Sequence, residues 1–167
     1  MATVKGLTDV FLKPGDLYVG DEGHQLRTIL GSCVSITLWH PLARRGGMSH
    51  FLLPTRGAAA HGQPLDGRYG DEALQLMINQ LEQAGVALSQ CKAKIFGGGN
   101  MFPAHMREGA INVGKRNGEA ARTMLEHHGI PIVSECLFGI GHRQVIFVVS
   151  TGDVWANQIK PSGLISN

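Results

Sequence analysis

The sequence is poor in cysteine, in charged residues and in long apolar runs, and each shortage argues against a class of protein. Its three cysteines show no CxxC spacing, so neither a disulfide framework nor a zinc site is expected. The net charge is +2 and no basic run occurs, which argues against a nucleic-acid partner. No window approaches ~18 consecutive apolar residues and the first residues carry no apolar leader, so we expect a cytoplasmic protein without membrane insertion.

What the chain does contain indicates one compact domain. Hydrophobic residues make up 43% of the 167 residues and charged residues 17%, a balance typical of globular rather than disordered proteins. A chain of this length suits a single domain, residues 1–167, with a substantial core. The 23 glycines indicate many turns and favour a strand-rich fold.

Hydrophobic periodicity and turn signals divide the chain into elements. Apolar residues at three- and four-residue spacing predict an amphipathic helix over 71–85. A second helix is predicted over 118–128, with Asn117 as its cap and Gly129 as its stop. The order of these elements predicts an α+β fold, a layered sandwich of mostly antiparallel β-sheet with two main helices. Strands are predicted at 17–19, 25–30, 33–39, 47–53, 93–97, 130–138, 143–151 and 154–159.

Cys33 is the candidate nucleophile. A free cysteine more often packs as a small hydrophobe, and a cysteine at the start of a strand needs no function to explain it. A nucleophile, however, needs an accessible sulfur and backbone N–H groups for a developing oxyanion. The two small residues before Cys33, Gly31 and Ser32, leave room for a substrate carbonyl to approach.

His50 is the candidate base, although a lone histidine in an apolar strand is often a packed one. Residues 40–47 are interpreted as a hairpin loop, which brings His50 back beside Cys33. A neighbouring imidazole can lower the pKa of a thiol from about 8.5 into the physiological range. A third group should orient the imidazole, and Thr28 is within reach on the preceding strand, although a strand threonine is common without any function.

The other chemistry-bearing residues give weaker indications. Beyond the adjacent pair His127 and His128, which points to different helix faces, no histidine outside the candidate site has metal-ligand spacing with a cysteine or a second histidine, so we expect no metal. The glycine run at 97–99 matches neither phosphate-binding motif and is interpreted as a strand end followed by a turn. Cys91 and Cys136 are interpreted as structural.

Six motifs together resemble those of the CheD family of chemoreceptor glutamine deamidases. They occur in that family's order and spacing, and the resemblance covers about residues 10 to 157. The motifs are TILGSCVSITLWHP, GGMSHFLLP, RYGDEAL, AKIFGGGNMF, VGKRNGEAA and RQVIFVVSTGDVW.

The resemblance implies a fold similar to the catalytic domain of deamidating bacterial toxins. It implies hydrolysis of selected glutamine side chains on methyl-accepting chemotaxis receptors, without a cofactor. The cysteine and histidine of the family's Cys-His-Thr triad carry over to Cys33 and His50. In the mechanism expected from this pair, backbone N–H groups near Ser32 and Cys33 stabilise the oxyanion. The threonine stays open between Thr28 and the alternative spacing, where Arg27 stands, because one step along a strand reverses the side chain.

Two other functions remain open. The chain is alternatively a non-catalytic adaptor that binds receptors or a CheC-type phosphatase, a partner that the resemblance also implies. A cysteine peptidase or a transglutaminase-like enzyme would use the same thiol and imidazole. For the deamidase, we expect an open groove that fits a receptor helix, with the polar loop 55–70 as one wall.

Overall fold

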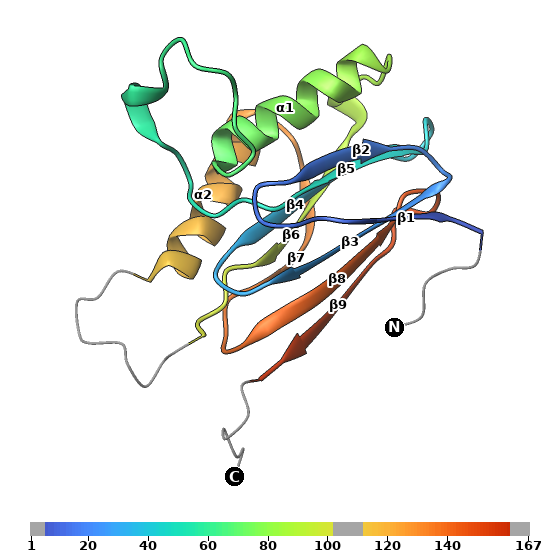
Figure 1. Ribbon diagram of the computed structural model, residues 1–167. Helices are drawn as coiled ribbons and strands as arrows, with labels where there is room; N and C mark the ends of the chain where they lie inside the picture. Colours follow the sequence, from blue (N-terminus) through green and yellow to red (C-terminus); the bar gives the residue numbers. More distant parts are fainter. Residues whose placement is uncertain (1–5, 102–111, 161–167) are drawn as a thin grey trace.

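Two β-sheets and two helices form three layers in the computed structural model (Figure 1), which describes residues 6–101 and 112–160. The five-stranded sheet has the order β2-β5-β4-β6-β7 and the four-stranded sheet the order β1-β3-β8-β9. Both helices pack on one face of the five-stranded sheet, and the four-stranded sheet lies against its other face. The predicted α+β sandwich is thereby confirmed. Its elements are β1 (Thr8–Phe11), β2 (Leu17–Gly20), β3 (His24–Leu30), β4 (Val34–His40), β5 (Arg45–Ser49), η1 (Gly57–Ala60), α1 (Gly70–Gln83), η2 (Leu88–Gln90), β6 (Lys92–Gly97), α2 (Val113–His127), β7 (Ile132–Leu137), β8 (His142–Val148) and β9 (Val154–Ile159).

Antiparallel pairing predominates, as predicted. The β2–β5, β4–β5, β4–β6, β3–β8 and β8–β9 pairs are antiparallel, while β1–β3 and β6–β7 are parallel. The four-residue edge strand β1 was missed from the sequence, because TDVF is short and mostly exposed and so carries little hydrophobic pattern.

The central strand β4 serves two cores at once. Side chains alternate between the two faces of a strand. Val34, Ile36 and Leu38 are fully buried against the helices. On the opposite face, Cys33, just before β4, and Trp39 pack into the layer between the sheets.

The first helix agrees with its prediction, but the start of the second does not. The α2 helix begins at Val113, and the side chain of Asn112 caps it by accepting a hydrogen bond of 3.0 Å from the Lys115 N–H. The assignment of Asn117 as the cap was wrong, since Asn117 lies inside the helix and is fully buried. Gly114, in the first turn of α2, allows a close approach: a Cβ atom at this position would lie 2.5 Å from the Gly98 carbonyl oxygen.

The second helix ends as predicted, with Gly129 at φ +68° directly after its last turn. No helix within residues 6–101 and 112–160 combines the length and apolarity needed to cross a membrane. His105, one of the histidines considered as a metal ligand, lies outside the described residues.

Candidate active site

Cys33 and His50 lie at the ends of two paired strands. The ladder between β4 and β5 continues through Val34 and Phe51, whose backbone groups exchange hydrogen bonds of 3.1 and 3.0 Å. In this register Cys33 and His50 are diagonal neighbours on one face of the sheet, the face toward the four-stranded sheet. Cys33 is half-buried and His50 is buried. The predicted hairpin therefore brings the two side chains to the same face.

Thr28 reaches His50 from the opposite sheet. Its Oγ1 lies 2.7 Å from His50 Nδ1 and also donates to the Leu12 carbonyl oxygen at 2.9 Å. A threonine hydroxyl has one hydrogen to donate. Since the Leu12 carbonyl takes that hydrogen, the hydroxyl accepts from the Nδ1–H of His50. This arrangement leaves the lone pair on Nε2, the tautomer that a general base needs.

Arg27, the alternative to Thr28, does not join this group. Its guanidinium lies on the outer side of the four-stranded sheet, where its Nε and Nη2 are each 2.8 Å from a carboxylate oxygen of Asp9. The guanidinium also stacks over the ring of Phe11. Of the two candidates for the third triad residue, Thr28 therefore faces the imidazole of His50, whereas Arg27 points to the opposite face of the strand.

Burial keeps both Cys33 and His50 neutral at rest. It raises the pKa of the Cys33 thiol above its ordinary value. It also lowers the pKa of His50 to about 4, a shift that the charge of Asp16 and the Leu12 carbonyl oppose. Among the described residues, the Cys33 sulfur has no hydrogen-bond partner. The sequence-based expectation of a lowered thiol pKa is therefore not met, because desolvation dominates at this site.

The backbone of Gly31-Ser32-Cys33 is held through all three of its carbonyl groups. The Gly31 and Cys33 oxygens accept the N–H groups of Gly99 and Gly98, each at 2.9 Å. The Ser32 oxygen accepts from Nδ2 of Asn117 at 3.0 Å. Within the described part of the chain, the N–H groups of Ser32 and Cys33 have no partner. Two free donors thus lie on a fixed backbone beside the thiol.

Sequence reasoning missed the residues that hold this backbone. The glycine run at 97–99 was interpreted as a simple turn, yet its N–H groups anchor the cysteine segment. At Gly97, with φ +109°, a Cβ atom would come within 2.3 Å of the Cys33 carbonyl oxygen. Asn117 was assigned to a cap. The run of three glycines directly after a strand was the available signal for a close backbone approach.

Comparison with known sequences identifies the family. The family model "CheD chemotactic sensory transduction" matches residues 52–158. A probable chemoreceptor glutamine deamidase CheD 2 of Albidiferax ferrireducens is 63% identical over 98% of this chain and 94% of its own length. The corresponding proteins of Pseudomonas savastanoi pv. phaseolicola and Chromobacterium violaceum are 42% and 43% identical over 93% of this chain and over 87% and 80% of their own lengths.

This chain belongs to the CheD family. The family model begins after His50, so it covers Asn117 and the glycine run at 97–99 but neither Cys33 nor His50. The relative that is 63% identical aligns with 98% of the chain. Membership in the CheD family therefore rests on most of the molecule and not on the cysteine motif alone.

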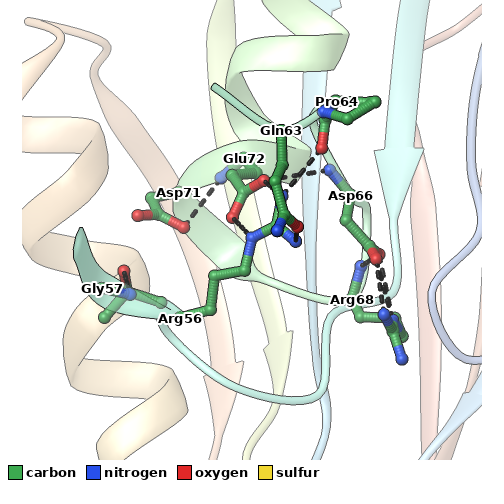
Figure 2. Close-up of polar contacts among 9 residues, drawn as sticks. Arg56, Gly57, Gln63, Pro64, Asp66, Arg68, Asp71 and Glu72 are labelled. Carbon is green, nitrogen blue, oxygen red and sulfur yellow. Dashed lines mark hydrogen bonds and ion pairs between the residues drawn. The ribbon is translucent and has the colours of Figure 1, made fainter. Parts of the chain in front are cut away.

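Loop 55–70 of this CheD-family chain is held by a partly buried ion pair. Figure 2 shows Arg56 reaching across the loop to Glu72 on α1, with N–O distances of 2.9 and 2.8 Å. Arg56 also donates to the Pro64 carbonyl oxygen, and Glu72 accepts the Asp66 N–H. Specific polar contacts thus hold the described part of this polar loop in place.

The end of this loop lies close to the catalytic candidates. The Arg68 carbonyl oxygen accepts the N–H of Leu52, two residues after His50. A Cβ atom at Gly67 would lie 2.3 Å from the Gly15 carbonyl oxygen, while the Gly15 N–H donates to the His50 carbonyl. These contacts agree with the expectation that the loop forms one wall of a substrate groove, but that wall itself stays a prediction.

In residues 6–101 and 112–160, no group of three or more His, Cys, Asp or Glu residues is arranged to hold a metal ion.

Proposed function

We propose that this chain hydrolyses the side-chain amides of selected glutamines on methyl-accepting chemotaxis receptors, with Cys33 as nucleophile. The observation that carries the proposal is the contact of 2.7 Å between Thr28 Oγ1 and His50 Nδ1, on the sheet face that Cys33 shares. It supplies an oriented base beside a thiol, the arrangement that nucleophilic catalysis requires. The printed names of the relatives, probable chemoreceptor glutamine deamidases, support the same reaction.

The first half of the reaction forms a thioester. His50 Nε2 takes the thiol proton as the Cys33 sulfur attacks the glutamine carbonyl carbon. Because both groups are neutral at rest, this proton transfer accompanies the attack instead of preceding it. The oxyanion accepts hydrogen bonds from the N–H groups of Ser32 and Cys33. The imidazolium then returns the proton to the nitrogen, and ammonia leaves.

The second half consumes water and regenerates the thiol. His50 takes a proton from a water molecule, which attacks the thioester carbonyl, and the same oxyanion donors serve again. The carbon–sulfur bond breaks, the thiol recovers its proton and glutamate is released. Each cycle exchanges one NH₂ group for one OH group, and the chemistry needs no cofactor.

The Cys33 sulfur must approach His50 for this cycle to begin. The resting structure has no hydrogen bond between them, yet the two side chains are diagonal neighbours on one face. Catalytic hydrogen bonds are often long without substrate and tighten in the complex. Docking of a receptor helix is expected to close the gap. Leu53, three residues after His50, is 46% exposed and offers the receptor helix an apolar contact beside the candidate site.

Cys33→Ala provides the test. With a receptor cytoplasmic fragment as substrate, the wild type should release ammonia and add about one dalton per modified glutamine, as expected when water resolves the covalent intermediate. Cys33→Ala should lower turnover by about 10⁶-fold, as loss of the nucleophile does in a serine-protease triad. Its circular dichroism should be unchanged because Cys33 is half-buried. A Cys33→Ala protein with full activity would refute the assignment.

The same experiment separates the other candidate functions. Receptor or CheC-type phosphatase binding without turnover by the wild type would favour the adaptor. Incorporation of an added amine in place of water would indicate transglutaminase chemistry. Cleavage of the receptor chain would indicate a peptidase.

A further inference from the structure

Asn117 connects the two chain segments that carry the candidate nucleophile and base. It lies in α2, fully buried, and its Nδ2 donates to the Ser32 carbonyl at 3.0 Å and to the Leu52 carbonyl at 2.8 Å. Ser32 precedes Cys33, and Leu52 follows His50 by two residues. Both hydrogens of one amide group thus hold the ends of two strands that are distant from α2 in the sequence.

Packing alone does not account for an asparagine at this position. Ala121 and Leu125, one and two turns further along α2, are fully buried apolar residues. The Oδ1 atom of Asn117 is buried without a hydrogen-bond partner among the described residues. An unpaired buried polar atom lowers the stability of the fold that contains it. A side chain that carries this cost while its Nδ2 bonds two site segments is better explained by what it positions.

The bond to Ser32 sets the direction of the Cys33 N–H. In a planar trans peptide the C=O and N–H groups point in opposite directions. Since the Ser32 carbonyl points at Asn117, the Cys33 N–H points away from α2. The neighbouring Gly31 and Cys33 carbonyls are held by the backbone of Gly99 and Gly98. Asn117 therefore fixes the middle peptide, the one whose rotation would turn the Cys33 N–H away.

We propose that Asn117 is a positioning residue that aligns the Cys33 N–H with the oxyanion formed at the thiol. The proposal deepens the proposed function and rests on it for the receptor reaction. It concerns, however, any acyl transfer to Cys33. Small acylating reagents therefore test it without a receptor.

Two reagents distinguish a misaligned Cys33 N–H from a general loss of Cys33 thiol reactivity. Acylation of Cys33 by p-nitrophenyl acetate passes through an oxyanion, whereas alkylation by iodoacetamide does not. The readout is the ratio of the two rates at one pH, after subtraction of the rates of Cys33→Ala. A variant that only lowers thiolate content or access slows both reactions and leaves the ratio unchanged.

Asn117→Leu is the main variant, because leucine keeps the side-chain volume and removes both donors. We expect the acylation-to-alkylation ratio to fall about 10- to 100-fold, less than the about 10²- to 10³-fold lost when an oxyanion donor is removed outright, because the Cys33 N–H is misaligned but still present. Asn117→Ser is the second variant, in case leucine prevents folding. Leu125→Ala is the matched control: it loosens the same helix face two turns away from Asn117, so its ratio should stay within about twofold of the wild type.

The outcomes distinguish this proposal from the proposed function. If the ratio falls in the Asn117 variants alone, alignment by Asn117 is established, even if the wild type releases no ammonia from receptors and the deamidase proposal fails. If the wild type deamidates receptors but the Asn117 variants keep the wild-type ratio, the positioning role is overturned. An equal fall in Leu125→Ala would overturn it as well, since general loosening would then suffice.

Discussion

The helix-covered face of the five-stranded sheet is mainly apolar, whereas its other face, toward the four-stranded sheet, mixes apolar and buried polar groups. On the helix side, the polar Ser49 is satisfied because its hydroxyl accepts the Ile36 N–H at 3.1 Å. Between the sheets, the Ser35 hydroxyl and the Arg143 Nε have no partner among the described residues. His50 is buried there as well. On the helix side, Asn117 Oδ1 is likewise unpaired among the described residues. The helix side is thus mainly apolar, whereas the layer between the sheets holds more of the buried polar groups, His50 of the candidate site among them.

This division predicts that damage to the apolar core on the helix side, away from Asn117, affects stability and spares activity. Leu38, on the helix side of β4, is fully buried. Leu38→Ala should lower the free energy of unfolding by about 2–5 kcal/mol, as leucine truncation in a packed core does. Turnover below the unfolding temperature should stay within about twofold, since Leu38 lies five residues along the strand from Cys33.

Urea unfolding followed by circular dichroism measures this effect. Leu42→Ala is the control, because Leu42 is 83% exposed and its truncation should change stability by less than about 0.5 kcal/mol. A loss of turnover in Leu38→Ala as large as its loss of stability would show that the two faces are not separate.

The second-largest expected effect is a loss of folding stability at acidic pH, caused by protonation of His50 between the sheets. Its pKa is about 4 in the folded chain and about 6.5 in the unfolded one. Between these values the unfolded chain binds the proton more readily. Stability is therefore complete above about pH 6.5 and falls as pH drops toward 4, by about 3 kcal/mol in all at about 1.4 kcal/mol per pH unit.

The measurement is the free energy of unfolding at pH 7, 5.5 and 4 for the wild type and for His50→Gln. The difference between the two proteins cancels the titration of all other groups that behave alike in both. It should shift by about 3 kcal/mol across the range. Parallel curves would mean that the His50 pKa is not lowered, and the contrast between the layer between the sheets and the rest of the molecule would weaken.

The sequence predicted those features that depend on one segment or on neighbouring ones. The three- and four-residue spacing in 71–85 predicted α1, and the hairpin at 40–47 predicted that Cys33 and His50 meet. What stayed open depends on packing between layers. Whether Thr28 or Arg27 faces His50 is decided by which face of β3 packs against the five-stranded sheet. No local pattern in β3 alone determines that choice.

Asn117 illustrates the same limit from the side of the helix. An asparagine before a glycine and a helical pattern is an ordinary cap signal, and Asn112 supplies an equally good one five residues earlier. The contacts that decide between them, to Ser32 and Leu52, join residues far apart in the chain. Cap chemistry is local and could be predicted, but a contact across layers could not.

The smallest predicted effect comes from replacing the hydroxyl of Thr28, which lies between the sheets, with a methyl group. Thr28→Val keeps the side-chain shape and removes the acceptor that fixes the Nδ1–H of His50. A lost hydrogen bond to a buried partner costs about 1–3 kcal/mol, which corresponds to a fall in kcat of about 10- to 100-fold. Thr28→Ser retains the hydroxyl and should stay within a few-fold of the wild type. Arg27→Ala, one residue away on the opposite face, should leave kcat within about twofold. If Arg27→Ala lowered kcat as much as Thr28→Val, orientation of the imidazole by Thr28 would not explain the loss, and the two faces of β3 would not differ in function as the geometry requires.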